Sequence, residues 1–146
     1  MANTHMGQPP KNHVTLVVEG VGSTGDPKED LGFRRIGSDG LPAHSLFRVP
    51  AGKVFVGTDV DWQYNSGEPR TKQIFVIFIR AMTGGGNESE IFESTVMLND
   101  TGEGGVSESM TSGFVVSSKA TFVVDARPGG GIIEHVVIRG YLCNES

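Results

Sequence analysis

The chain contains the run Ile74-Phe75-Val76-Ile77-Phe78-Ile79, six bulky β-forming residues in succession. Successive side chains of a β-strand point to opposite faces, so a strand built from this run is apolar on both faces. In a sheet with one face in water, apolar and polar residues would alternate instead. The run therefore predicts a central strand whose two faces are both covered by protein.

Runs rich in Val, Ile, Phe and Thr recur along the chain, separated by clusters of Gly, Pro, Asn and Asp. This pattern is typical of an all-β protein, and no window of helical length carries an apolar stripe at 3.6-residue spacing. We expect a single antiparallel β-sandwich, jelly-roll-like, with about eight strands and very little helix. The expected strands are residues 13–19, 45–49, 53–63, 72–82, 90–98, 107–117, 120–125 and 132–142.

The least regular part of the chain is residues 20–44, with one short strand expected around residues 33–36. Residues 20–25 have the glycine spacing of a dinucleotide-binding loop. That motif needs a helix directly after the glycines, within a parallel α/β unit. Gly32 follows too soon for such a helix. We therefore expect a plain glycine-rich loop.

The chain has 146 residues, enough for one domain with its own core. Residues 1–12 lack the apolar centre of a signal peptide and are expected to be a disordered or tag-derived segment. Residues 13–146 are then a single β-sandwich domain. The formal net charge is -5, and Lys and Arg are spread singly. We expect no nucleic-acid partner, because there is no basic stripe to follow a phosphate backbone.

No apolar run approaches the length of a membrane-spanning helix, so no membrane insertion is expected. The lone Cys143 excludes a disulfide within the chain. The compartment is not fixed by these features, but an extracellular or particle-surface location is favoured over the cytoplasm.

Several other expected strands are also apolar on both faces, among them residues 14–18, 122–124 and 136–138. A sandwich of two sheets has one core, so the surplus apolar faces predict a homo-oligomer, with a trimer favoured. The arrangement resembles the three-fold bundles of jelly rolls in TNF and C1q domains and in viral and bacterial fibre heads. The comparison is architectural, because no motif residue matches those families. The alternative is that loops of the same chain cover the outer face.

We expect the subunit interface on the face shared by Ile74, Val76, Phe78, Arg80 and Met82. The opposite face of the same strand is more uniformly apolar and suits the core. Arg80 interrupts the first face, and we expect it to form an ion pair with a neighbouring subunit. Its expected partners there are Glu90 or Glu93.

A polar face is expected on the strand at residues 53–63, where Asp59, Asp61 and Gln63 alternate with Val60 and Trp62. The phase places Trp62 in the core together with Val54, Val56, Thr58 and Val60, opposite Lys53, Phe55, Gly57 and the two aspartates. The two carboxylates should lie about 7 Å apart, in range of a shared cation or of sugar hydroxyl groups.

The candidate ligand-binding residues are Asp59, Asp61, Gln63, Tyr64 and Asn65. Tyr64 is expected at the rim of the core, beside amide side chains that suit sugar hydroxyls. The sequence requires no cofactor. Calcium is the one candidate, and it would need a further carboxylate to converge on this strand because Ca²⁺ takes six to eight oxygen ligands.

No catalytic residue is assigned, and we expect a non-enzyme. The serines lack a nucleophile elbow, and the four histidines lack the spacing of metal ligands, His135 being expected at the surface or an interface. The favoured function is a non-catalytic oligomeric binding module, lectin-like and glycan-binding or the head of a surface fibre used in adhesion. The alternatives are a structural coat, capsid or decoration protein, and a glycan hydrolase that uses Asp59 and Asp61.

Overall fold

The computed structural model describes residues 10–19, 32–83 and 87–146. Within these residues there is no α-helix, and the single helical element is the short 3-10 helix η1 (Pro10–Asn12) at the end of the segment expected to be unstructured. No helix in this part has the length and apolarity that crossing a bilayer requires. The strands are β1 (His13–Glu19), β2 (Arg34–Arg35), β3 (Lys53–Asn65), β4 (Lys72–Ala81), β5 (Glu88–Met97), β6 (Gly104–Ser117), β7 (Ala120–Arg127) and β8 (Ile132–Asn144).

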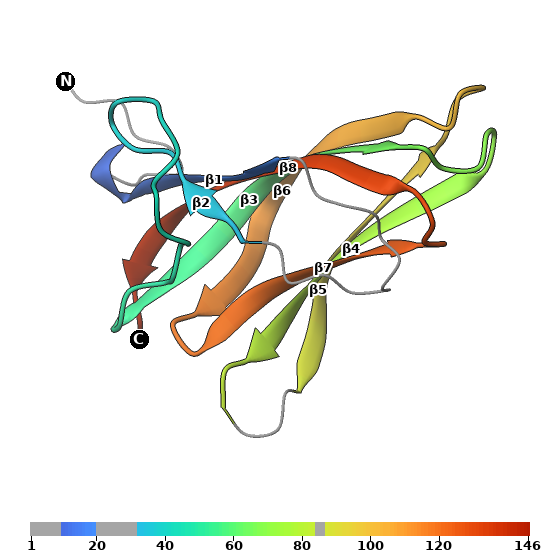
Figure 1. Ribbon diagram of the computed structural model, residues 1–146. Helices are drawn as coiled ribbons and strands as arrows, with labels where there is room; N and C mark the ends of the chain where they lie inside the picture. Colours follow the sequence, from blue (N-terminus) through green and yellow to red (C-terminus); the bar gives the residue numbers. More distant parts are fainter. Residues whose placement is uncertain (1–9, 20–31, 84–86) are drawn as a thin grey trace.

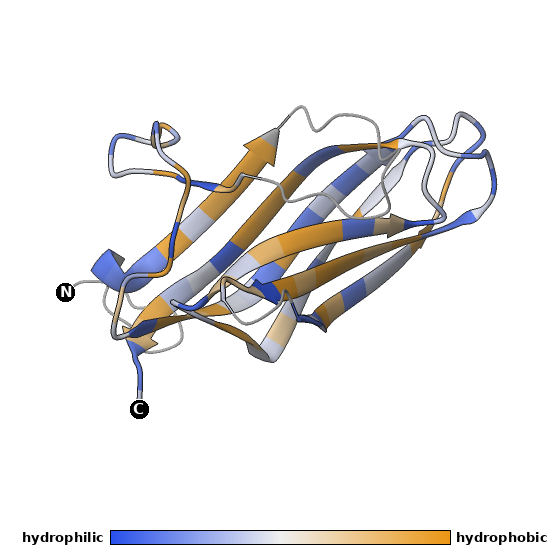
Figure 2. Cartoon of the chain, turned by 60° about the horizontal axis from the view of Figure 1, so that its bottom comes forward, coloured by the Kyte–Doolittle hydropathy of each residue, from blue (hydrophilic) through white to orange (hydrophobic). Residues whose placement is uncertain are grey.

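The strands form two stacked sheets (Figure 1). One is five-stranded, in the order β2-β1-β8-β3-β6, and the other is three-stranded, in the order β5-β4-β7. Every ladder is antiparallel. Figure 2 shows that hydrophobic residues concentrate in the strands, whereas the turns are largely hydrophilic. The expected antiparallel β-sandwich with very little helix is confirmed.

One expected strand is wrong. Residues 45–49 join no ladder. Phe47 N of this segment donates a backbone hydrogen bond to Phe33 O of the adjacent segment (2.7 Å). The short strand expected around residues 33–36 does form, as β2 paired with β1. Residues 20–25, expected to be a glycine-rich loop, and residues 1–9 lie outside the described residues.

The core between the sheets is built on aromatic side chains. Trp62 of β3 stacks on Phe75 of β4 with ring centroids 5.2 Å apart, and Phe75 meets Phe92 of β5 edge-on at 6.4 Å. The indole of Trp62 donates a hydrogen bond to Ser94 Oγ (2.8 Å), which satisfies its buried N–H group. The expected core position of Trp62 is confirmed.

A bulge in β3 changes the expected phase of this strand. Gly57 pairs with Gly140 of β8 and Asp59 pairs with the adjacent Arg139, so Thr58 is an extra residue in β3, and on the β6 side it faces residues 110–113. Such an insertion reverses which side chains point inward on either side of it. Phe55 is therefore buried in the core with Val60 and Trp62, while Val54 and Val56 share the outer face with Asp59. The strict alternation expected across residues 53–63 is wrong.

Two glycines make this bulge sterically feasible. A Cβ atom on Gly57 would lie 2.4 Å from the ring of Phe114, so only a glycine lets that ring enter the core. Gly113 closes the bulge at a φ of 76°, a conformation that glycine adopts without strain.

The outer face of β4 is covered within the single chain. Val76, Phe78 and Val123 are only 0%, 7% and 0% exposed. The guanidinium of Arg127 lies over the Phe78 ring, 5.4 Å from its centroid. Its Nε atom donates to Asp125 Oδ2 (3.0 Å). Of the apolar residues expected at an interface on this face, Met82 alone is largely exposed, at 53%, so the centre of the face is not available to a neighbour.

Arg80 also has a different partner from the one expected. Its guanidinium contacts Glu88 Oε1 of the same chain through Nε (3.0 Å) and a terminal nitrogen (2.8 Å). The two residues lie opposite each other on β4 and β5. The charge of Arg80 is thus matched by a cross-strand neighbour, and the structure gives no support to a pairing with Glu90 or Glu93 of a neighbouring subunit.

The paired carboxyl groups of Glu90 and Glu93 predict a pH dependence of stability. A hydrogen bond to Glu93 raises the pKa of Glu90 above its ordinary 4.5, as do burial and the negative charge of Glu93, while Arg127 opposes the shift. A raised pKa in the folded state means that this contribution to stability is present below pH 4.5 and is lost as the pH rises. Glu93→Gln should therefore stabilise the protein relative to wild type at pH 7, and by less at pH 4.

Urea unfolding of wild type and Glu93→Gln between pH 3.5 and 7 measures this difference. Glu68→Gln, on the loop between β3 and β4, is the matched control and should show no pH-dependent difference. If the free energies of unfolding of Glu93→Gln and wild type differ by the same amount from pH 3.5 to 7, the proposed coupling between the carboxyl groups of Glu90 and Glu93 is contradicted.

Candidate functional site on the five-stranded sheet

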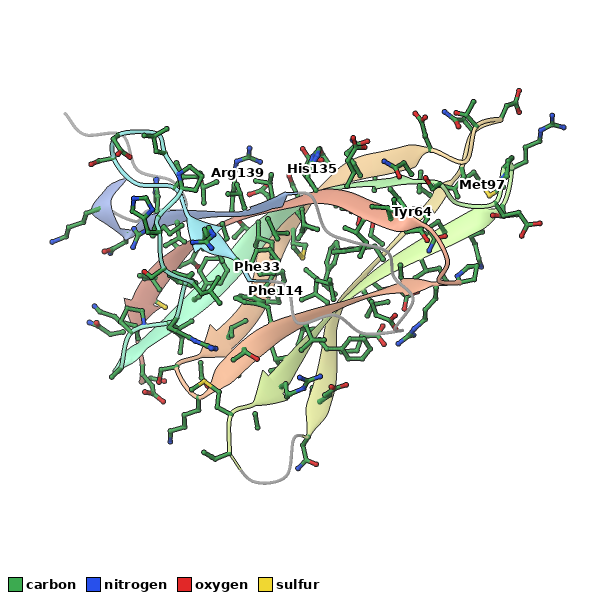
Figure 3. All side chains as sticks on the ribbon, viewed as in Figure 1. Phe33, Tyr64, Met97, Phe114, His135 and Arg139 are labelled. Carbon is green, nitrogen blue, oxygen red and sulfur yellow. The ribbon has the colours of Figure 1, made fainter. Side chains whose placement is uncertain are left out.

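The outer face of the five-stranded sheet is the side that points away from the core. Figure 3 shows His135 and Arg139 on this side of β8, whereas Tyr64 and Phe114 lie between the two sheets. Residues that pair directly across antiparallel strands share a face, so the register of β1, β8, β3 and β6 defines which side chains lie together here. Three of the five candidate ligand-binding residues, Asp59, Asp61 and Gln63, are on this face.

Asp59 lies at the centre of the face, opposite Arg139 of β8 and Ser109 of β6. Both of its carboxylate oxygens accept hydrogen bonds from hydroxyl groups. Ser109 Oγ donates to Oδ1 (2.5 Å), and Thr58 Oγ1 donates to Oδ2 (2.7 Å). The bulge at Thr58 brings the second hydroxyl group into place, so the strand irregularity itself fixes the orientation of this carboxylate.

Asp61 lies next to Asp59 on the same face, opposite Val137. The imidazole of His135 lies 4.0 Å away, measured from Nε2 to Asp61 Oδ1. This distance is too long for a hydrogen bond. Gln63 follows in the row of His135. The expected arrangement of Asp59, Asp61 and Gln63 along one face is therefore present.

The other two candidates lie elsewhere. Tyr64 is buried in the core, and its hydroxyl oxygen accepts a hydrogen bond from Gly131 N (2.7 Å). It ties the turn before β8 to β3 and is not at a rim. Asn65 ends β3, and its Oδ1 accepts a hydrogen bond from Ser66 Oγ (3.1 Å). With Trp62 and Tyr64 both buried, the expected aromatic platform for a sugar ring is absent from this end of β3.

A shallow hollow of about 210 Å³ adjoins Asp59. Its polar lining comes from His13, Thr15, Asp59 and Arg139, and Asp61 is not part of it. The two aspartates therefore do not share one cleft. Within the described ranges, no three His, Cys, Asp or Glu side chains are arranged to hold a metal ion.

Apolar side chains border the polar centre of the face. Val56 lies in one row between Tyr141 and Val115, and Val115 is 55% exposed. Val17 and Val137 lie in the row of Asp61. A sheet face in contact with water normally carries polar residues, and the exposed Val115 departs from that pattern.

Reasoning from the sequence missed the residues that β1, β6 and β8 contribute. The alternation of β8 indicates that His135, Val137, Arg139 and Tyr141 share a face. It does not indicate that β8 lies beside β3. That adjacency comes from the sheet order, in which strands far apart in the chain are neighbours.

Comparison with known proteins supports the fold. No protein-family model matches the chain, and no curated protein matches it in sequence. Among solved structures, the fold is similar to that of murine APRIL at pH 5.0, with a TM-score of 0.53 and 8% identity over 88% of this chain and 98% of that one.

A second match is to the cowpea mosaic virus top component, naturally occurring empty particles, with a TM-score of 0.34 and 10% identity over 92% of this chain and 81% of that one. This likeness is too distant to add to the argument. The similarity to APRIL shows the fold alone, and it confirms a jelly-roll-like sandwich.

Proposed function

We propose that this protein is a non-catalytic module that associates with copies of itself through the outer face of the five-stranded sheet. We also propose that it works outside the cell or on a particle surface. The observation that carries the first proposal is Val115, a large apolar side chain that is 55% exposed on this face, in one row with buried Val56 and half-buried Tyr141. Burial of such surface contributes about 25 cal/mol per Å2.

The charges of the face favour a second copy as the occupant. Arg139 is exposed, and its guanidinium makes no ion pair or hydrogen bond within the part of the chain that the structure describes. Asp61 brings a carboxylate that accepts no hydrogen bond from the described residues. A face that carries one unmatched charge of each sign is complementary to itself.

The other candidate functions have less support. A glycan hydrolase would need both aspartates at one cleft, but only Asp59 borders the hollow. A lectin-like site at this end of β3 would need Trp62 or Tyr64 at the surface, and both are buried. The geometry therefore favours self-association over glycan binding or catalysis.

Val115→Asp is expected to abolish self-association while leaving the fold intact. The side chain is 55% exposed in the single chain, so a charge there costs the monomer less than about 0.5 kcal/mol. In an assembly it would be buried without a partner, at a cost of several kcal/mol. Met97→Asp is the matched control, because Met97 is 64% exposed at the far end of β5 (Figure 3).

Light scattering and sedimentation at micromolar concentration measure the outcome. Wild type and Met97→Asp should form the same small oligomer, and Val115→Asp should remain at the 15.5 kDa of the single chain. A wild type that stays at that mass at every concentration would refute self-association. Particles of megadalton mass would instead support a coat protein.

A further inference from the structure

We propose that Arg139 of one copy forms an ion pair with Asp61 of a neighbouring copy, and that this pair sets the register of the assembly. The inference rests on the proposed function, since it names the contact by which the outer face of one copy recognises another. It requires the same face of each copy to lie near a common rotation axis, two-fold or three-fold.

The first observation is that the guanidinium of Arg139 makes no ion pair or hydrogen bond with any residue that the structure describes, although a carboxylate lies directly across from it. Asp59 and Arg139 are register partners on β3 and β8. The carboxylate of Asp59, however, is already held by Ser109 Oγ and Thr58 Oγ1 at 2.5 and 2.7 Å. A carboxylate oriented by two hydroxyl groups is solvated by the protein and does not need the guanidinium.

The second observation concerns Asp61. Its side chain is 30% exposed, and the imidazole of His135 lies 4.0 Å from its Oδ1 atom, too far for a hydrogen bond. Asp61 therefore faces water without a cation at hydrogen-bond distance within the described residues. Its position beside Val137 places it in the same surface as Arg139, one row away.

Burial makes this pairing necessary. An ion moved out of water without a partner costs several kcal/mol, which would cancel the gain from covering Val115, Tyr141 and Val137. Contact between two copies of the face buries one guanidinium and one free carboxylate from each. A planar guanidinium and a carboxylate form two parallel hydrogen bonds, which fixes orientation as well as adding stability.

A pair within one chain is the competing explanation. Asp61 and Arg139 are diagonal neighbours on adjacent strands, a separation that a long side chain spans. The structure does not form this contact. Mixing two charge-reversed variants distinguishes a pair within a chain from a pair between chains.

The experiment uses Arg139→Glu and Asp61→Arg as full-length proteins. Each variant alone carries like charges at the two positions and should associate at least tenfold more weakly than wild type. Immobilised, tagged Arg139→Glu should capture Asp61→Arg but should not capture a second copy of itself. The double variant Arg139→Glu/Asp61→Arg should associate with itself again.

Arg70→Glu is the matched charge reversal, because Arg70 pairs with Asp100 on an exposed loop where both side chains are at least 77% exposed. It should associate like wild type. Equal association of Arg139→Glu and wild type overturns the proposed pair, as does recovery in the double variant without cross-capture, which would place the pair within one chain. If wild type itself does not associate, the proposed function is overturned together with the ion pair.

Thermal unfolding of each variant checks that the monomer is intact. Arg139 is exposed and its side chain makes no hydrogen bond or ion pair with the described residues, so its reversal should leave the melting temperature of the monomer within a few degrees. A folded Arg139→Glu that fails to associate therefore supports the pair.

Discussion

Phe75→Ala is expected to lower the free energy of unfolding by about 3–5 kcal/mol, a large part of the stability of a domain of this size. Phe75 is fully buried, stacks on Trp62 and meets Phe92 edge-on. Its removal leaves a cavity between the two sheets, where the β-strand scaffold cannot easily close in. Urea or guanidinium unfolding followed by tryptophan fluorescence measures the loss, with Trp62 as the reporter.

Phe78→Ala is the matched control, because it removes the same side chain from the opposite face of the same strand. Phe78 lies in the small cluster with Val76 and Val123, under the guanidinium of Arg127. Water can enter there and the charged side chain can resettle, so we expect a smaller loss of about 1–3 kcal/mol. Equal losses for the two variants would show that the outer cluster is as tightly packed as the core.

Arg127→Met is expected to destabilise the fold by about 2–4 kcal/mol, far more than removal of an exposed arginine. Asp125 is 4% exposed, and its Oδ1 has no hydrogen-bond partner in the described structure. Arg127 donates to the other oxygen, Oδ2, at 3.0 Å. Without it, a buried carboxylate is left uncompensated, whereas methionine still covers the ring of Phe78.

The double variant Arg127→Met/Asp125→Asn separates charge from packing. If the uncompensated carboxylate of Asp125 causes most of the destabilisation, the added Asp125→Asn should recover at least half of the loss in unfolding free energy. Arg70→Met, which breaks an exposed ion pair with Asp100, should change stability by less than about 0.5 kcal/mol. A loss in Arg127→Met no larger than in Arg70→Met would contradict a structural role for the guanidinium.

The strands were largely predictable because their apolar runs are long and bounded by turn residues. The strand expected at residues 45–49 does not form, for a physical reason. Leu46, Phe47 and Val49 have the composition of a strand, but a strand also requires a neighbour with a free edge in register. This segment makes one backbone hydrogen bond to Phe33, and Arg34–Arg35 pairs with β1 instead.

The phase of β3 was predictable only on one side of Thr58. From Asp59 onward, alternation correctly placed Asp59, Asp61 and Gln63 on one face and Trp62 on the other. Before Thr58 it placed Phe55 outside, because Thr58 is an extra residue that has no partner on β8 and reverses the phase of the strand. A bulge depends on two strands at once, so a periodicity measured along one strand cannot reveal it.

The outer face of the β4 run shows a similar limit. Apolar residues on both faces correctly predicted burial, but they did not identify the cover. Arg127, Asp125 and Glu90 come from strands on either side of β4, with 3.8 Å between Arg127 and Glu90. The apolar stems of charged side chains can cover apolar surface, and here the guanidinium of Arg127 lies over the ring of Phe78.

The bulge opposite Thr58 has a consequence for the free edge of β6. Among the described strands β6 pairs with β3 alone, so one side of a 14-residue strand presents unpaired backbone groups. A straight edge of that length would be a template for endless strand addition and amyloid-type growth. Residues 110–113 divide it into two short segments that are out of step with each other. An incoming strand therefore cannot pair along the whole length of β6. The irregularity thus blocks open-ended strand addition at this free edge.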